Sequence, residues 1–420
     1  MAELRFTDVF VPGGFPRHTY NPRLGLQLES KIEQVRHNLC KLVTVTGHTK
    51  SGKTVLVRKI LPREDSVWVD GGAVGAEDDF WQIVLDQLNL FQSSEIENST
   101  EKSSELAASV TAKTDLLVLK GEGEVGGTLG ASHSTATTQS RIVSSRVAAL
   151  SGLRSSKRPL VVDDFHYLPR ELQGELVRAL KPLIFDGVAV VIIAIPHRRY
   201  DAIRVEKEMT GRILSVEIPK WEDKELFFIP ETGFQLLKQH VGSEVVDRFA
   251  REAIGSPHLT QEFCRGVCRA KSTDGFTLPE PLAVTASDVE KVFIEAADTI
   301  GRPIFEKLAR GPRQRTDRIP RALRDGQSVD IYGLVLHALA HIRPGLVTLE
   351  YEDLRSAIRA VSPVDIPQLH EVARVLKHMS DLAASDQSSS PVIDFDEESK
   401  LLHITDPFFA FYLRWGKLDG

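Results

Sequence analysis

The most informative residues are the eight at 47–54, which combine two glycines, two lysines and three hydroxyl side chains. They are Gly47, His48, Thr49, Lys50, Ser51, Gly52, Lys53 and Thr54, and they match G-x-x-x-x-G-K-[ST]. An apolar run at 42–46 predicts a buried strand before them, and the run at 55–60 predicts a helix after them. Between a strand and a helix, the backbone N–H groups of such a loop wrap a polyphosphate. We therefore expect Lys53 to reach the β- and γ-phosphates and Thr54 to hold Mg²⁺.

A pair of carboxylates follows a second apolar run. Leu160-Val161-Val162 predicts a strand, and Asp163-Asp164 stands at its carboxyl end. Asp163 is predicted to hold the Mg²⁺ shell through water, and Asp164 to orient or deprotonate the attacking water. Acidic turns after strands are common, so this pair is informative because the phosphate loop precedes it.

A cation is predicted to complete the site. The apolar run at 188–195 predicts the next strand, and Pro196-His197-Arg198-Arg199 follows it. In a fold with such a phosphate loop, this strand is expected to lie between the other two, so its exit residue faces the γ-phosphate. Arg198 is then the first candidate for neutralising the charge that develops there, and Arg199 is the second. The alternative is that both are solvated surface arginines. Arg212 is a weaker candidate, acting either within the chain or across to a neighbouring subunit.

The elements that must position these residues alternate between strands and helices. Short strands are predicted at 66–69 and 213–218, with helices at 78–91, 169–183 and 200–209. This alternation predicts an α/β fold with a parallel sheet at 42–220. With the phosphate loop in it, this region resembles a P-loop NTPase core of the ASCE type. Residues 1–41 are predicted to form a nucleotide-side segment and a helix.

Residues 93–140 interrupt the alternation, because they are rich in Ser, Thr and Gly and poor in large apolar residues. One interpretation is an insertion with a hairpin near 115–130 that contacts DNA or a partner. The other is a disordered surface insertion. A helix is predicted to follow at 139–150.

Beyond the core, the sequence predicts a helical lid at 221–284. Ser287 and Glu290 predict a capping box that opens the next helix. The helices that follow, and then short strands at 391–395 and 401–404, have the element order of a winged helix, so 285–420 is predicted to be a winged-helix domain. Its last helix carries Phe408, Phe411, Tyr412 and Trp415 at helical spacing. We expect this aromatic face to dock on the winged helix; the alternative is a partner-binding surface.

Taken together, these motifs resemble a STAND-type P-loop ATPase, from the AAA+-related branch of signalling ATPases. The resemblance rests on the phosphate loop, Asp163-Asp164, Arg198 and Gly255-Ser256-Pro257, which resembles the G-x-P motif of the family's lid. It implies the cofactors ATP and Mg²⁺, with Pro257 against the nucleotide, and a switch that self-associates. The segment at 20–23 resembles the family's N-terminal adenine-side motif only loosely. Since the usual base of AAA+ ATPases is glutamate, Asp164 implies slow or partner-stimulated hydrolysis.

Composition limits the partners. A net charge of −6 argues against nucleic-acid binding over the whole surface, but it leaves a local basic patch open. Three cysteines cannot form a disulfide framework and suit a reducing compartment. The longest apolar run, 188–195, is far shorter than the roughly 20 residues of a membrane-spanning helix, and the start has no signal-peptide pattern. We expect a cytoplasmic protein without a membrane partner, and an unidentified protein as sensor or effector.

One local stretch keeps DNA open as a partner. Eight basic and three acidic residues lie between Arg302 and Asp325, a net charge of +5. Residues 302–324 are either a phosphate-contacting patch or a solvated connector. The rival function is therefore an ATP-regulated DNA-binding protein of the initiator-loader or transposition-regulator kind. In contrast, the predicted recognition helix at 367–379 is not strongly basic, which favours internal packing.

Overall fold

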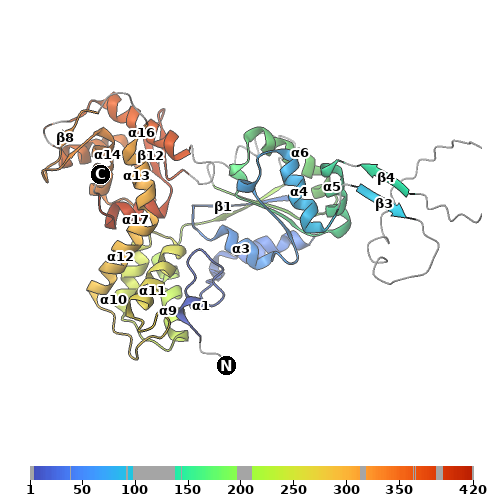
Figure 1. Cartoon of the computed structure of the whole chain (residues 1–420), viewed down its shortest axis with the longest axis horizontal. Helices are drawn as coiled ribbons and strands as arrows, with labels where there is room; N and C mark the ends of the chain where they lie inside the picture. Colours follow the sequence, from blue (N-terminus) through green and yellow to red (C-terminus); the bar gives the residue numbers. More distant parts are fainter. Residues whose placement is uncertain are drawn as a thin grey trace, which may run out of the picture.

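The structure is a computed structural model. It describes residues 4–37, 39–90, 93–97, 138–142, 144–195, 211–312, 318–362, 364, 366–384 and 391–418. Three regions follow one another in the chain: an α/β region, a helical region and a C-terminal region. Figure 1 shows the helical and C-terminal regions together on one side of the α/β region. Among the helices of the described residues, none has both the length and the apolar character that a membrane crossing requires.

The α/β region is built on a parallel sheet with the strand order β2-β5-β6-β1-β7. Its strands are β1 (Leu42–Gly47), β2 (Val67–Asp70), β5 (Leu160–Asp163), β6 (Val190–Ala194) and β7 (Ile213–Ile218). Strand β6 lies between β5 and β1, as predicted, so the carboxyl ends of β5, β6 and β1 meet at one edge. Alternate residues enter two separate apolar clusters, so the sheet is covered on both faces.

The two faces of the sheet carry different helices. One face packs against α2 (Leu28–Glu33) and α3 (Lys53–Ile60). The other packs against α4 (Glu77–Leu88), α5 (Ser145–Ser156) and α6 (Arg170–Phe185). The predicted helix at 139–150 begins later than expected, because residues 138–142 form a strand. Ser144 is extended and its side chain accepts from the Val147 N–H, which starts α5 there.

The predicted insertion at 93–140 is bounded by a strand pair. Strand β3 (Ser93–Glu97) pairs antiparallel with β4 (Thr138–Ile142). The pair lies at the end of the molecule away from the C-terminal region (Figure 1). The hairpin predicted near 115–130 and the helix predicted at 200–209 lie outside the described residues.

The helical region follows β7. Its helices are α8 (Asp223–Leu226), α9 (Phe228–Leu236), α10 (Ser243–Glu252) and α11 (Pro257–Lys271). The short N-terminal helix α1 (Phe6–Val9) shares their apolar cluster, and the rings of Phe10 and Phe234 lie 5.1 Å apart. The next helix, α12 (Ala286–Ile300), does open with a capping box, but the pair is Thr285 and Asp288. The sequence prediction was two residues late, because Thr285 is the residue whose backbone is extended.

The C-terminal region combines helices with small antiparallel sheets. Its helices are α13 (Arg302–Arg310), α14 (Ile331–Ile342), α15 (Tyr351–Val361), α16 (Leu369–Ala384) and α17 (Pro407–Trp415). Its strands are β8 (Arg321–Ala322), β9 (Ser328–Val329), β10 (Thr348–Glu350), β11 (Ile393–Asp396) and β12 (Leu401–Ile404). The order β10-β12-β11 forms a three-stranded sheet beside α14, α15 and α16.

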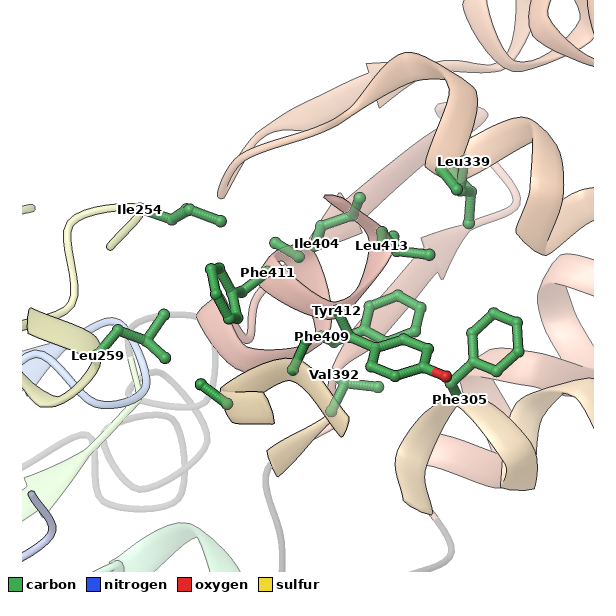
Figure 2. Close-up of a cluster of buried hydrophobic side chains, with 14 of the residues drawn as sticks. Ile254, Leu259, Phe305, Leu339, Val392, Ile404, Phe409, Phe411, Tyr412 and Leu413 are labelled. Carbon is green, nitrogen blue, oxygen red and sulfur yellow. The ribbon is translucent and has the colours of Figure 1, made fainter. Parts of the chain in front are cut away.

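Helix α17 joins two regions, which differs from the docking predicted for it. Figure 2 shows its buried side chains Phe409, Phe411, Tyr412 and Leu413 between Ile254 and Leu259 on one side and Leu339 and Phe305 on the other. The Phe411 ring lies 5.0 Å from that of Phe263 in α11, and Trp415 lies 4.9 Å from Phe293 in α12. Because Phe409 and Leu413 lie off the predicted face and are also buried, α17 buries more than that single face.

Candidate nucleotide-binding site

The phosphate loop lies between β1 and α3, as predicted. Strand β1 ends at Gly47 and α3 begins at Lys53. Gly52 has a φ of 89°, a left-handed conformation that glycine adopts without a steric penalty. Lys50 also has a positive φ, 59°, which costs a residue with a Cβ some strain. The tight turn therefore brings consecutive N–H groups to the amino end of a helix, where anions bind.

Lys53 lies inside this loop. Its side chain is 8% exposed, and its Nζ donates to the Gly47 carbonyl at 3.0 Å and the His48 carbonyl at 2.8 Å. Burial lowers the pKa of Lys53 to about 8, although Asp164 and Asp163 act in the opposite direction. When Lys53 binds a phosphate, its ammonium therefore leaves the two carbonyls and donates to phosphate oxygens held in the same loop.

The predicted metal ligands are neighbours. The Thr54 hydroxyl donates to Asp163 Oδ1 at 3.2 Å, and the backbone N–H of Asp164 donates to the same oxygen at 3.0 Å. Burial and the nearby Asp164 raise the pKa of Asp163 to about 6. One hydroxyl and one carboxylate fit Mg²⁺, which takes one or two protein oxygens and fills its other positions with phosphate and water. Among the described residues, no group of three or more His, Cys, Asp or Glu side chains is arranged to hold a metal ion.

Asp164 is held in an uncommon backbone conformation. Its φ is 48°, in the left-handed region, at the start of the 3₁₀ turn η4 (Phe165–Tyr167). A Cβ on Gly71, just after β2, would lie 2.5 Å from the Asp164 carbonyl oxygen. Only glycine therefore fits beside this turn. Burial raises the pKa of Asp164 above its ordinary value, with Asp70 adding to the rise and Lys53 opposing it.

These groups face a cavity of about 300 Å³. The phosphate loop and Asp164 line one side. The N-terminal segment lines another side with residues that include all of Tyr20-Asn21-Pro22-Arg23, and the helical region contributes Trp221, Pro257, His258 and Gln261. Pro257 is the first residue of α11, behind the N-cap Ser256. The structure thus brings Lys53, Thr54, Asp164 and Pro257 to one cavity, with Asp163 beside Thr54.

The far side of the cavity includes residues whose importance the motifs did not indicate. Gln261 donates to the Thr19 hydroxyl at 2.6 Å and accepts from the Val11 N–H at 3.2 Å. His258 lies 4.8 Å from the Phe408 ring of α17, and burial lowers its pKa to about 4. Lys50 Nζ lies 5.4 Å from the same Phe408 ring centroid. No local pattern marks these contacts, because their partners are far apart in sequence.

The arginines have separate outcomes. Arg198 and Arg199 lie outside the described residues, although Ile195, just after β6, lines the cavity as the strand order requires. Arg212 cannot act on the nucleotide site of its own chain. Its carbonyl accepts from the N–H of Leu42, the first residue of β1, so it lies about 20 Å along the strand from the phosphate loop. There its guanidinium lies 5.7 Å from the ring of Phe185.

The basic stretch at 302–324 is already partly neutralised. Arg302 pairs with Glu306 at 2.9 Å, Arg318 with Asp330, and Arg321 with Glu371 at 3.7 Å. Among the described basic residues of the stretch, Arg310 and Arg324 are exposed. The patch is therefore weaker than its net charge implied.

Comparisons with known proteins give structural matches only. No protein-family model and no curated protein matches the sequence. The Walker-type ATPase paby2304 of Pyrococcus abyssi matches with a TM-score of 0.54 at 12% identity, over 94% of this chain and 97% of that chain. The Aeropyrum pernix ORC2 protein in its ADPNP–ADP complexes matches at 0.47 and 13%, over 96% of each chain. The Aeropyrum pernix ORC1 protein in complex with DNA matches at 0.44 and 11%, over 95% of this chain and 94% of that chain.

At these identities, similarity establishes the fold and not the activity. The chain has the α/β fold of a P-loop NTPase, and the first match extends that similarity over almost its whole length. The sequence resembles a signalling subtype of this fold, but the matched structures do not support that subtype.

Proposed function

We propose that this chain is an ATP-driven molecular switch that binds MgATP between its α/β region and α11, and hydrolyses it slowly. One observation carries the proposal. A single cavity is lined by Lys53, Thr54 and Asp164 on one side and by Tyr20 and Pro257 on the other. A nucleotide that fills the cavity contacts the α/β region and the helical region at once. Loss of its γ-phosphate can therefore change how these two regions are arranged.

Each residue has a role that its environment supports. The Lys53 ammonium binds the β- and γ-phosphates, while Thr54 and Asp163 would hold Mg²⁺, which supplies further charge neutralisation when bound. Asp164 accepts the proton of the attacking water. Its raised pKa moves it toward neutral pH, where a general base is most effective. Arg198 stays the first candidate for the cation that completes the site.

The switch needs a path from the phosphate loop to the rest of the molecule. Lys50 of the loop and His258 of α11 both contact Phe408, at the start of α17. Asp406 caps this helix by accepting from the Phe408 and Phe409 N–H groups at 2.8 and 2.9 Å. These contacts support coupling between nucleotide state and the C-terminal region, which we interpret as a winged helix packed internally.

Self-association is part of the proposal. Arg212 lies beside Phe185, which is 66% exposed, at the edge of the sheet away from its own phosphate loop. A cation at that edge serves a nucleotide only in a neighbouring copy. The boundaries proposed for the working parts are 1–41, 42–220, 221–284 and 285–420, and a sensor or effector would be a separate protein.

ATP-regulated DNA binding is a second candidate for the output of the switch. Two of the matched structures are ORC proteins, one of them in complex with DNA, and these lie nearer to this candidate than to signalling. Because that match has a TM-score of 0.44, the candidate rests on the C-terminal elements, where α16 exposes Arg374 and Lys377. Lys377 pairs with Glu397 at 2.8 Å, and this pairing weakens the case for DNA binding. Salt-dependent binding to duplex DNA would support this candidate, and absence of binding at low salt would exclude it.

Phosphate release from ATP, measured over a range of protein concentrations, tests the main proposal. The control is Asp164→Asn rather than alanine, because asparagine tolerates the left-handed backbone at this position. We expect release in the wild type that rises per molecule with concentration, and a loss of about a hundredfold or more in the variant with ATP binding retained. Binding without release would reduce the chain to a nucleotide-binding protein, and absence of binding would refute the proposal.

A further inference from the structure

Trp221 lies where three parts of the molecule meet. It follows β7, and its indole N–H donates to the Ser51 carbonyl of the phosphate loop at 2.9 Å. The Arg23 guanidinium of the N-terminal segment lies 4.5 Å from its ring centroid. Its own carbonyl lies 3.3 Å from where a Cβ on Gly255 would be, so the turn before α11 packs directly against it.

Arg23 fixes the segment that carries Trp221. It is 6% exposed, and its guanidinium binds both oxygens of Glu225, at 2.9 and 2.8 Å. It also donates to the carbonyls of Pro219 and Lys220, at 2.9 and 3.1 Å. All of these acceptors lie within residues 219–225, on either side of Trp221. A planar donor with several fixed N–H groups holds such a segment in one conformation, which a lysine cannot do.

Ser51 depends on this anchor. It is 4% exposed, and its hydroxyl is buried with no hydrogen-bond partner among the described residues. The loop is instead held through carbonyls: Ser51 by Trp221 from outside, and Gly47 and His48 by Lys53 from inside. The outside anchor remains when Lys53 turns to a phosphate.

We propose that Trp221, held by Arg23, is a positioning residue that fixes the orientation of the phosphate loop for polyphosphate binding. This inference rests on the proposed function, because it concerns the same cavity. Without the indole N–H, the Ser51 peptide is free to reorient, and the N–H groups that follow it lose their alignment. The loss falls on ligands with a β-phosphate more than on those with a single phosphate.

The decisive variant is Trp221→Phe, which keeps an aromatic ring beside Arg23, shortens the ring system and removes the indole N–H donor. Trp68→Phe is the matched control, since the Trp68 indole also donates to a carbonyl, that of Leu61 at 3.1 Å, and its ring also lies beside an arginine, Arg63 at 5.3 Å. Trp68 is buried in the core and does not line the cavity. ADP and AMP affinities are measured by calorimetry for wild type and both variants, together with melting temperatures.

We expect Trp221→Phe to lower the affinity for ADP about five- to tenfold, as the loss of one hydrogen bond predicts. The affinity for AMP should fall less than about twofold. Trp68→Phe should leave both affinities within about twofold, even if it lowers the melting temperature more. A double-mutant cycle completes the test. If Arg23 acts through Trp221, Arg23→Lys weakens ADP in the wild type but has little further effect in the Trp221→Phe background.

The outcomes separate the inference from the proposed function. If the wild type and Trp221→Phe bind ADP with equal affinity, the inference is overturned and the proposed function is not. Equal weakening of ADP and AMP, with a lower melting temperature, shows a merely structural tryptophan and also overturns it. If the effects of Arg23→Lys and Trp221→Phe on ADP affinity are additive, Arg23 does not act through Trp221. Wild type that binds neither ATP nor ADP overturns the proposed function itself.

Discussion

The phosphate side of the cavity and the side opposite it are built in different ways. The phosphate side comes from eight consecutive residues, 47–54, and from the end of strand β5, which β6 separates from β1. The opposite side comes from segments that are distant in sequence, such as Val11 and Gln261, which are 250 residues apart and joined by a hydrogen bond. Turn geometry at the end of a strand fixes the first side. Packing between whole regions fixes the second.

This difference suggests a separate role for each side of the cavity. A loop fixed by its own backbone is suited to binding phosphate in the same way whatever the rest of the molecule does. A wall made of contacts between regions changes when those regions move, so it is suited to reporting what is bound. We therefore expect changes on the phosphate side to abolish activity, and changes on the opposite side to adjust affinity.

Lys53→Ala gives the largest expected effect on the phosphate side. Removing the ammonium that faces the β- and γ-phosphates should lower ATP turnover by about 10² to 10³, the usual loss for one essential charge-stabilising donor. Phosphate release and ADP calorimetry measure it.

The control for Lys53→Ala is Lys41→Ala, which removes an exposed lysine just before β1. It should leave turnover within about twofold. Turnover that survives in Lys53→Ala would show that the phosphate side is not the catalytic site, and the comparison between the two sides would lose its basis.

The pH dependence of nucleotide affinity should come from the phosphate side as well. Lys53 binds phosphate only when protonated, and its pKa is about 8, so ADP affinity should fall above that pH. Asp163 holds Mg²⁺ only when ionised, and its pKa is about 6, so the Mg²⁺-dependent part of the affinity should fall below that pH, by up to tenfold per unit.

The cavity histidine, His258, should not shape this profile. Burial lowers the pKa of His258 to about 4, so His258 is neutral across the range. Calorimetry from pH 5 to pH 9, with and without Mg²⁺, measures the two limbs. Asp163→Asn should remove the Mg²⁺-dependent acidic limb and leave the alkaline one. A flat profile in the wild type would contradict the assigned roles of Lys53 and Asp163.

The sequence was sufficient for the phosphate side because each of its features is local. The loop follows a strand, the Asp163-Asp164 pair follows another strand, and hydrophobic periodicity locates both. The place of β6 between β5 and β1 was predicted from the expected fold rather than from this pattern, and the structure confirms it. Capping was less reliable: Ser287 and Glu290 have the right spacing, but the backbone is extended two residues earlier, at Thr285.

The opposite side could not be derived in this way. Nothing near Trp221 indicates that it holds Ser51, because that bond depends on where β7 ends relative to β1. The aromatic helix shows the same limit. Its spacing predicted a buried face, but Phe409, which lies off the predicted face, is also fully buried, because neighbours from the helical and C-terminal regions surround α17. Side-chain spacing reports that a residue is buried, but not which distant residues bury it.

Phe408→Leu gives the smallest expected effect and tests the opposite side most directly. The Lys50 ammonium lies 5.4 Å from the Phe408 ring centroid, an interaction that contributes about 0.5–1 kcal/mol at a partly exposed site. Leucine keeps the apolar bulk at the start of α17 and removes the aromatic face. Lys50 is then free to approach the phosphates, so ADP affinity should rise by about two- to fivefold, the equivalent of that free energy.

Phe185→Leu is the matched control, because Phe185 also lies beside a cation, Arg212 at 5.7 Å, but at the edge of the sheet away from the phosphate loop. It should leave ADP affinity unchanged. An equal rise in both variants would point to a general effect of losing an aromatic ring. A fall in ADP affinity in Phe408→Leu would mean that Phe408 supports the nucleotide rather than competing for Lys50. In that case the side opposite the phosphate loop would bind the ligand as well as report it, and the division of work between the two sides would not hold.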